Sequence, residues 1–423
     1  MMGTIHVIGA GLAGLAAAVR LAQRGSSVVV HEAAGQAGGR CRSYHDPALD
    51  MVIDNGNHLL LSANRAALTF LATIGSAGGL VGPAAADFAF VDVRSGERWT
   101  LRMSEGRVPW WIFDRGRRVP GTKMRDYLAF ARLMRASPDE TICKRVRCAG
   151  LLYDRFARPL WLAALNTEPQ EGSAVLAAAV LRETLVAGGK ACRPLIAQAG
   201  LGPVFVAPAL SFLSKHNAAV NFGERLRALH FGEKEVAALD FGSHRVALAS
   251  DDAVILAVPP IVATDLLPHL NAPSEFRAIV NVHFRIAAPS KLPPITGIIN
   301  GTAEWLFRFP DRLAVTVSAA DRLLEVPRDV LARQIWDEVA MVAGLPKSMP
   351  PWQIVRERRA TFAATPVENA KRPGPQTSWP NLLLAGDWTQ TGLPATIEGA
   401  IRSGNRAADL VSRFRSSHGC AAP

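Results

Sequence analysis

The chain has 423 residues, of which 49% are hydrophobic, and its 47 Lys and Arg against 36 Asp and Glu give a net charge of +11. This length predicts a substantial core and two domains. No apolar run approaches 18 residues, which argues against a membrane-spanning helix, and the N-terminus has no basic leader, so we expect no signal peptide.

The cysteines, at positions 41, 143, 148, 192 and 420, are odd in number and form no C-x-x-C pair. This pattern predicts free thiols and a reducing cytoplasm. Cys143 and Cys148 are too few for a metal site, and we predict no metal.

The N-terminal segment has the pattern of a strand, a glycine turn and a helix. Residues 5–8 form an apolar run before the turn GAGLAG at 9–14, and apolar residues then recur at helical spacing until Gly25. Gly9 permits the tight turn, Gly11 lets the backbone approach a pyrophosphate, and Gly14 lets the helix lie close to the sheet. The helix N-terminus attracts phosphates. This order predicts a Rossmann-like dinucleotide-binding fold.

The next segment favours FAD over other dinucleotides. Glu32 lies 23 residues after Gly9, at the end of a second apolar run, where a carboxylate accepts ribose hydroxyls and repels the 2′-phosphate of NADP. A second glycine turn follows at 35–43, with Arg40 able to reach a phosphate. This set resembles the flavin-containing amine oxidase and carotenoid desaturase superfamily, which carries a G-G-R turn after the ribose acid. The resemblance implies that the cofactor is FAD.

Residues 98–158 are basic and aromatic, with 15 Lys and Arg against 6 Asp and Glu. Tryptophans interleaved with basic residues suit the headgroup region of an anionic membrane. A solvated basic face over buried aromatic residues explains the same pattern. Nucleic-acid binding is disfavoured because no recognised motif accompanies the charge. We expect a peripheral protein at the inner face of the membrane, with this region as the contact.

The later segments divide the chain between two domains. Strands are expected at 220–222, 226–229, 236–246 and 253–258, the last stopped by proline, and again near 280–286 and 313–318, with a helix over 329–343. We predict an α/β protein with a discontinuous Rossmann-like FAD-binding domain (1–75, 211–262 and 378–415) and an inserted α+β substrate domain (76–210 and 263–377). Residues 416–423 are expected to form a flexible tail.

The C-terminal segment is predicted to hold the flavin half of the cofactor. A short apolar run at 382–385 leads into Gly386, which lets the chain pass close to the cofactor, and Asp387, which accepts hydrogen bonds from ribityl hydroxyls. After Pro394 a helix is expected to run to Val411, with its N-terminus aimed at the edge of the isoalloxazine ring that becomes negative on reduction.

Four further segments make the resemblance more specific. They are DNGNHLLL at 54–61, LAALNT at 162–167, WLF at 305–307 and RATFAATP at 359–366. Together they resemble the squalene-associated FAD-dependent desaturases, also described as hydroxysqualene dehydroxylases. The resemblance implies that reduced FAD converts hydroxysqualene to squalene in bacterial hopanoid biosynthesis, by loss of an allylic hydroxyl and delivery of a hydride. The substrate is thus a long isoprenoid lipid, and the electron donor is left open.

The candidate catalytic residues are His58 and Asp54, in the segment expected beside the flavin, and Arg308, which follows WLF. His58 is a candidate because an imidazole can donate a proton near neutral pH. Aromatic faces expected to stabilise a transient cation are Trp305, Phe307, Phe309 and Trp388. The residues expected to bind the cofactor are Gly9, Gly11, Leu12, Ala13, Gly14, Glu32, Ala33, Gly38, Gly39, Arg40, Asn55, Gly56, Asn57, Leu226, Gly386, Asp387, Thr396 and Ile397.

Three alternatives remain open from the sequence. A carotenoid or phytoene-type desaturase would share the fold but transfer hydride to the flavin. A flavin amine oxidase would need an aromatic cage, for which no pattern is evident. A non-catalytic FAD-binding partner of a lipid-synthesis assembly belongs to a different class.

Overall fold

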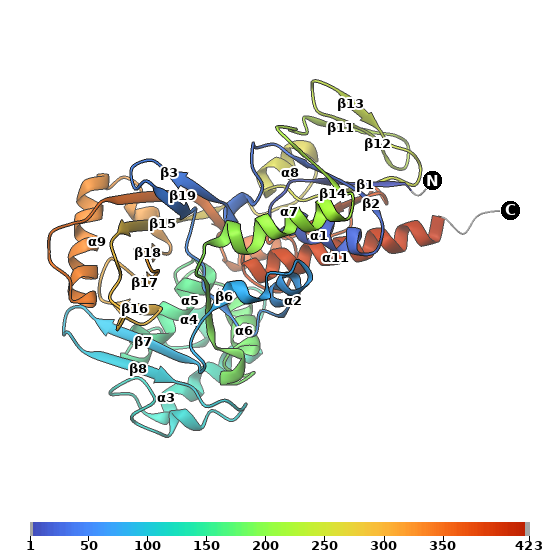
Figure 1. The fold of residues 1–423 in the computed structure, drawn as a ribbon. Helices are drawn as coiled ribbons and strands as arrows, with labels where there is room; N and C mark the ends of the chain where they lie inside the picture. Colours follow the sequence, from blue (N-terminus) through green and yellow to red (C-terminus); the bar gives the residue numbers. More distant parts are fainter. Residues whose placement is uncertain (1–2, 419–423) are drawn as a thin grey trace.

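The computed structural model describes residues 3–418 and is built on two large sheets (Figure 1). Within these residues, every helix is too short or too polar to span a bilayer. The first sheet has the order β10 (Ala219–Phe222), β2 (Ser27–Glu32), β1 (Thr4–Ile8), β14 (Ala253–Leu256) and β20 (Leu382–Leu384), and every neighbouring pair is parallel. Segments far apart in the chain therefore meet in one nucleotide-binding sheet, as the sequence predicted.

Both faces of this parallel sheet are covered, which explains its continuous apolar strands. One face shares a core with α1 (Leu12–Gln23), α7 (Ala207–Lys215) and α11 (Ile397–His418). The other face packs in a core that includes the small antiparallel sheet of β11 (Ala228–Phe231), β12 (Val236–Asp240) and β13 (Arg245–Ala247) and helix α8 (Pro260–Leu266).

The second sheet has seven strands and lies on the opposite side of the molecule in Figure 1. Its order is β19 (Trp352–Phe362), β15 (Phe276–Arg285), β18 (Arg312–Val317), β17 (Trp305–Arg308), β16 (Ile295–Ile299), β7 (Asp87–Asp92) and β8 (Arg98–Arg102). Side chains alternate between its faces. On β15, Val280, Val282 and Phe284 pack against α9 (Arg328–Ala343), so that Asn281 and His283 point to the other face.

A helical cap and short strands connect the sheets. The cap contains α3 (Met124–Leu128), α4 (Ile142–Arg145), α5 (Arg158–Leu165) and α6 (Ala174–Glu183). The remaining elements are α2 (Arg65–Thr73), α10 (Pro366–Ala370), the hairpin of β3 (Ser43–Asp46) and β4 (Met51–Asp54), and β5 (Leu60–Leu61), β9 (Pro194–Ala197) and β6 (Leu80–Val81).

Several element bounds differ from the predicted ones. Helix α11 extends to His418, so residues 416–418 are helical and not part of a tail, while residues 419–423 lie outside the described part of the chain. The predicted boundaries at 210/211 and 262/263 fall inside α7 and α8. Helix α7 shares a core with α1. The first residues of α7, which the prediction gave to the substrate domain, therefore pack with the nucleotide-binding sheet. The division into an FAD-binding and a substrate domain stays a prediction.

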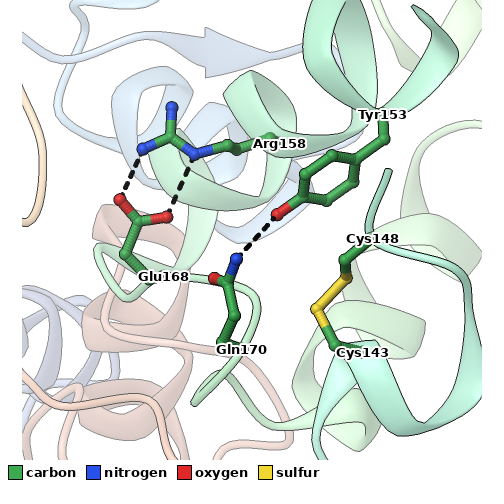
Figure 2. Close-up of a disulfide and its surroundings, with 6 residues drawn as sticks. All are labelled: Cys143, Cys148, Tyr153, Arg158, Glu168 and Gln170. Carbon is green, nitrogen blue, oxygen red and sulfur yellow. Dashed lines mark hydrogen bonds and ion pairs between the residues drawn. A yellow bond between two sulfur atoms is a disulfide. The ribbon is translucent and has the colours of Figure 1, made fainter. Parts of the chain in front are cut away.

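The prediction that all cysteines are free thiols is wrong for one pair. Cys143 and Cys148 form a disulfide in the cap, with Cα atoms 5.4 Å apart (Figure 2). Helix α4 ends at Arg145 and the chain turns back, so a separation of five residues brings the two side chains together. Cys41 and Cys192 are free and buried, and Cys420 lies outside the described residues. The cysteines therefore no longer argue for a reducing compartment.

The double variant Cys143→Ser/Cys148→Ser should lower the free energy of unfolding by about 2 kcal/mol, because the disulfide closes a short loop in the unfolded chain. Urea unfolding with and without a thiol reductant measures this effect. The reductant should destabilise the native protein by the same amount and leave the double variant unchanged. Finding five reactive thiols in the denatured native protein, rather than the three that one disulfide leaves, would contradict the pairing.

Candidate functional site

The two glycine turns predicted to hold the pyrophosphate lie against each other. The Gly38 N–H donates to the Ala10 carbonyl at 2.8 Å, and a Cβ on Gly39 would lie 3.4 Å from the Gly11 Cα. Gly9 has φ +104°, and a Cβ on Gly14 would lie 1.9 Å from the Gly9 carbonyl oxygen. A Cβ on Gly11, however, would meet no atom within 4 Å. Gly11 thus borders open space at the start of α1, which fits a phosphate group.

The ribose side of the site is organised by Glu32, at the end of β2. Its carboxylate accepts hydrogen bonds from the Ala10 N–H at 2.7 Å and the Ala34 N–H at 2.8 Å, which fix its orientation beside the first glycine turn and Ala33. The segment leading to Leu226 lies alongside, because the Glu224 N–H donates to the Glu32 carbonyl at 2.9 Å. The predicted adenosine-binding residues therefore come together.

The flavin side is joined to the second glycine turn by an ion pair. The sequence predicted a phosphate as the partner of Arg40. In the structure its guanidinium binds the Asp387 carboxylate at 2.7 Å and the Ala360 carbonyl at 2.5 Å. Asp387 lies 347 residues further along the chain and is almost fully buried. The attraction of Asp387 is the main cause that raises the pKa of Arg40. This ion pair clamps the two cofactor segments together.

Helix α11 brings Thr396 and Ile397 to the same site. The Gly386 N–H donates to the Ser403 hydroxyl at 2.9 Å, which ties Gly386 to α11. A Cβ on Gly404 would lie 2.0 Å from the Ala13 carbonyl oxygen, so α11 and α1 are in close contact. Thr396 caps α11 by accepting the Gly399 N–H at 3.0 Å.

Asn55, Gly56 and Asn57 lie on the face of the second sheet opposite α9. The Asn57 amide donates to the Thr316 hydroxyl at 3.3 Å and to the Asn281 carbonyl oxygen at 3.4 Å. Asn55 donates to the Glu357 carboxylate at 3.3 Å. Within the described chain, the buried Asn57 Oδ1 accepts no hydrogen bond. A buried acceptor without a protein donor fits a bound group that carries one, as the isoalloxazine ring of FAD does.

His58 is neutral in this environment, contrary to the prediction that it donates a proton near neutral pH. Burial and then the nearby Arg40 guanidinium lower the pKa of His58 to about 4. At pH 7 only about one molecule in a thousand would carry the imidazolium. The ring lies beside Gly56, whose Cβ would be 3.7 Å from Nε2.

Asp54 and Arg308 are not joined to His58. The Asp54 carboxylate accepts the Ser43 hydroxyl at 2.5 Å and the Leu201 N–H at 2.8 Å, and lies 3.7 Å from Arg312. Burial raises the pKa of Asp54, although these three groups oppose the shift. Asp54 thus anchors two loops. Arg308 ends β17, and in the described residues no hydrogen bond or ion pair links its side chain to His58 or Asp54.

An aromatic cluster fills the space between the second sheet and the cap. The buried aromatic residues of this cluster are Phe88, Phe90, Trp99, Trp111, Tyr127, Phe156, Trp305, Phe307 and Phe309. Leu59 and Leu61, which follow His58, pack against it. The Arg312 guanidinium already covers the ring of Phe309 at 3.9 Å. Trp388 belongs to a different core and donates to the Val258 carbonyl. Trp305 and Phe307 thus remain as candidate cation-stabilising faces.

Three important side chains had no signal in the sequence. Glu398 is buried and accepts the Ala66 and Ala67 N–H groups at the start of α2. Arg372 is buried and binds the backbone around Asp387. Glu304 lies just before the WLF segment. All three are charged residues in ordinary loop or helix contexts, and only their burial distinguishes them.

Replacing Gly11 and Gly14 should have different consequences. Gly11→Ala should fold normally, because Gly11 has φ −72° and its Cβ would meet no atom within 4 Å, yet its methyl group should weaken cofactor binding about tenfold or more. Gly14→Ala should prevent folding, since its Cβ would overlap the Gly9 carbonyl. Flavin absorbance per protein and thermal unfolding of the apoprotein measure these effects. Full flavin content in Gly11→Ala would contradict the assignment of this cradle.

Comparison with known proteins finds a family that matches most of the chain. The family described as flavin containing amine oxidoreductase matches residues 12–412. The chain is 58% identical over 412 residues to a hydroxysqualene dehydroxylase of Rhodopseudomonas palustris, covering 97% of this chain and 99% of the relative. It is 53% identical over 407 residues to a hydroxysqualene dehydroxylase of Sinorhizobium fredii, covering 96% and 98%.

Among solved structures, the fold is similar to that of cyclohexylamine oxidase from Brevibacterium oxydans. The TM-score is 0.71 at 15% sequence identity, covering 99% of this chain and all of that one. At this identity the likeness concerns the fold alone.

Proposed function

The chain belongs to the flavin containing amine oxidoreductase family and is an FAD-dependent oxidoreductase, and from this we infer that it removes the hydroxyl group of hydroxysqualene reductively to give squalene. The observation that carries the inference is that near-full-length relatives, identical at more than half of their positions, bear this activity in their names. The same relatives disfavour the desaturase, amine oxidase and binding-partner alternatives.

The described residues fit each need of this reaction. The glycine turns, Glu32 and the Arg40–Asp387 clamp would hold FAD, which supplies a hydride when it is bound and reduced. The aromatic cluster offers an apolar surface for an isoprenoid chain and excludes water from a reactive carbon. The faces of Trp305 and Phe307 would stabilise positive charge by about 1 to 2 kcal/mol each.

The assignment is tested by anaerobic incubation of the protein with chemically reduced FAD and hydroxysqualene. The expected result is squalene, identified by mass spectrometry, together with return of the absorbance of oxidised flavin. Bleaching of oxidised flavin by phytoene or by a primary amine would select the desaturase or the amine oxidase instead. Failure of every substrate to change the flavin would favour a non-catalytic role.

We also propose that the protein binds the inner face of the membrane, where its lipid substrate dissolves. Within residues 98–158, the exposed fraction is 64% for Trp110 and 56% for Phe113. Val108, Leu128 and Leu151 are exposed as well. The Trp110 and Phe113 rings lie side by side, with centroids 5.8 Å apart, and we call these two side chains the apolar patch. The excess of basic residues in 98–158 complements anionic headgroups, at about 1 kcal/mol per residue near the surface.

The double variant Trp110→Ser/Phe113→Ser should bind anionic vesicles about tenfold or more weakly, because two large rings no longer enter the lipid. Sedimentation with phosphatidylserine-containing vesicles measures binding, which should also fall as salt rises. Val330→Ser/Val367→Ser is the matched control, because these exposed side chains lie outside the cap. Equal binding by the two double variants would argue against the apolar patch.

A further inference from the structure

Glu304 is a partly buried carboxylate at the junction of the second sheet and the cap. It immediately precedes β17, and its side chain is 15% exposed. One carboxylate oxygen accepts the Ser318 N–H at 2.8 Å, and the other lies 3.9 Å from the Arg322 guanidinium. The carboxylate is therefore oriented by the backbone at the end of β18.

This position adjoins the sheet face that holds the flavin segment. Trp305, the residue after Glu304, is the cross-strand partner of Thr316, and Thr316 binds Asn57 through its hydroxyl. Ser318 lies two residues beyond Thr316, which corresponds to about 7 Å along a strand on the same face. Glu304 thus immediately precedes Trp305, a member of the aromatic cluster, and its carboxylate binds the Ser318 N–H just after β18 ends.

A second set of contacts links this corner to the cofactor clamp. The Asn166 carbonyl oxygen accepts the Ala319 N–H at 2.6 Å, and its amide donates to the Thr361 hydroxyl at 3.0 Å. Thr361 follows Ala360, whose carbonyl binds Arg40. The LAALNT and RATFAATP segments therefore hold the corner near Glu304 in a defined position relative to the Arg40–Asp387 clamp.

The surrounding charges leave Glu304 able to hold or release a proton near neutral pH. Arg158 and Glu168 form a two-bond ion pair in the adjoining cap, at 2.5 and 3.1 Å (Figure 2). Burial raises the pKa of Glu304 to about 7, the Ser318 N–H, Arg322 and Arg158 oppose the rise, and Glu168 adds to it. At pH 7 about half of the molecules would carry the proton.

We propose that Glu304 is the proton donor to the leaving hydroxyl group of the substrate, an inference that rests on the proposed function. The carboxyl O–H bond breaks and its proton passes to the hydroxyl oxygen. The allylic C–O bond then breaks, and its electron pair leaves with water. The carbon accepts a hydride whose two electrons come from reduced FAD, which is thereby oxidised. The Glu304 carboxylate regains a proton from solvent.

The other acids of the predicted site suit this role less well. His58 is neutral at pH 7, with its pKa lowered to about 4. Asp54 is engaged by Ser43 and Leu201 and faces Arg312, in a loop-anchoring position. Glu304 is oriented by the Ser318 N–H and immediately precedes Trp305 of the aromatic cluster.

The test compares Glu304→Gln with Glu338→Gln. Glu338 is a matched control, because burial raises the pKa of its carboxyl group too. Glu338 lies on α9, on the other face of the sheet, and accepts the Thr302 and Ala303 N–H groups of the loop that precedes Glu304. Glu304→Gln should slow squalene formation by about 100-fold or more while retaining its flavin spectrum and its affinity for squalene. Glu338→Gln should stay within a few-fold of the native rate.

The pH dependence supplies a second measurement. Because the acid form is required, the native rate of squalene formation should be high below pH 7 and fall as the pH rises through about 7. The rate of Glu304→Gln should not show this fall. Infrared difference spectra should show a protonated-carboxyl band that titrates near pH 7 in native protein and Glu338→Gln but is missing in Glu304→Gln. If Glu304→Gln does not fold, Glu304→Asp should retain partial activity, and the pH at which its rate falls should differ from the native value. A fall at the native pH would overturn the proposal.

The two proposals fail differently. Native protein that makes no squalene overturns the proposed function. Native protein that makes squalene, with Glu304→Gln equally active, overturns only the role of Glu304.

Discussion

Asp387→Ala is expected to yield a protein that loses its flavin during purification. The Asp387 carboxylate is buried and holds the Arg40 guanidinium at 2.7 Å, so its removal leaves Arg40 with the Ala360 carbonyl as its remaining hydrogen-bond acceptor. It also removes the acceptor predicted for the ribityl hydroxyls of FAD. Hydrogen bonds to charged groups contribute about 1.5 to 3 kcal/mol each, so affinity for FAD should fall about 100-fold or more.

Flavin absorbance per protein and titration of the apoprotein with FAD measure this loss. Asp409→Ala is the control, because Asp409 also pairs with arginines, Arg20 and Arg24, but on the partly exposed surface where α11 meets α1. It should retain its flavin, since exposed ion pairs contribute little. If the Asp387→Ala protein kept native affinity for FAD, the Arg40–Asp387 ion pair would not contribute to FAD binding.

Arg372→Leu should cause a large loss of stability. The Arg372 guanidinium is buried and donates to the carbonyl oxygens of Asp387 at 3.0 Å, Leu393 at 2.8 Å and Thr389 at 2.5 Å. Burial lowers the pKa of Arg372 to about 10, while Asp387 opposes the shift, so the side chain is charged at pH 7. Leucine would leave several buried acceptors without donors, and we expect the free energy of unfolding to fall by about 4 kcal/mol or more.

Urea unfolding measures this change, and solubility serves if the variant does not fold. Arg372→Lys should lie between native protein and Arg372→Leu, because an ammonium has three donors where a guanidinium has five. Arg333→Leu is the control, since Arg333 is exposed on α9 and makes one hydrogen bond, to the Lys347 carbonyl. Equal stability of Arg372→Leu and Arg333→Leu would show that the loop around Asp387 does not depend on Arg372.

The local pattern of the chain was sufficient to predict the segments that the fold brings together at the proposed cofactor site. The signals in this pattern are short-range, because each lies where a strand ends at the same edge of a parallel sheet. They are the glycines at 9, 11 and 14, the acid at 32 and the glycine–aspartate pair at 386 and 387. The helix predicted over 329–343 is confirmed as α9, whose apolar positions recur at helical spacing.

The catalytic candidates were less predictable, because a side chain's chemistry depends on neighbours from distant segments. An imidazole with its usual pKa could donate a proton near neutral pH, but burial and Arg40 lower the pKa of His58. Glu304 has no motif, and its environment is made by Ser318, Arg322 and the cap residues Arg158 and Glu168. The Cys143–Cys148 disulfide likewise required the turn after α4.

By itself, the sequence determined that this chain folds around a parallel nucleotide-binding sheet and that its cofactor is FAD, because strand-end glycines and acids form patterns only a few residues long. Only the tertiary structure decided that Arg40 clamps Asp387, that Arg372 supports the loop behind it, and that burial raises the pKa of Glu304 to about 7. These properties arise from burial and from charges brought together across long separations, which no local pattern records.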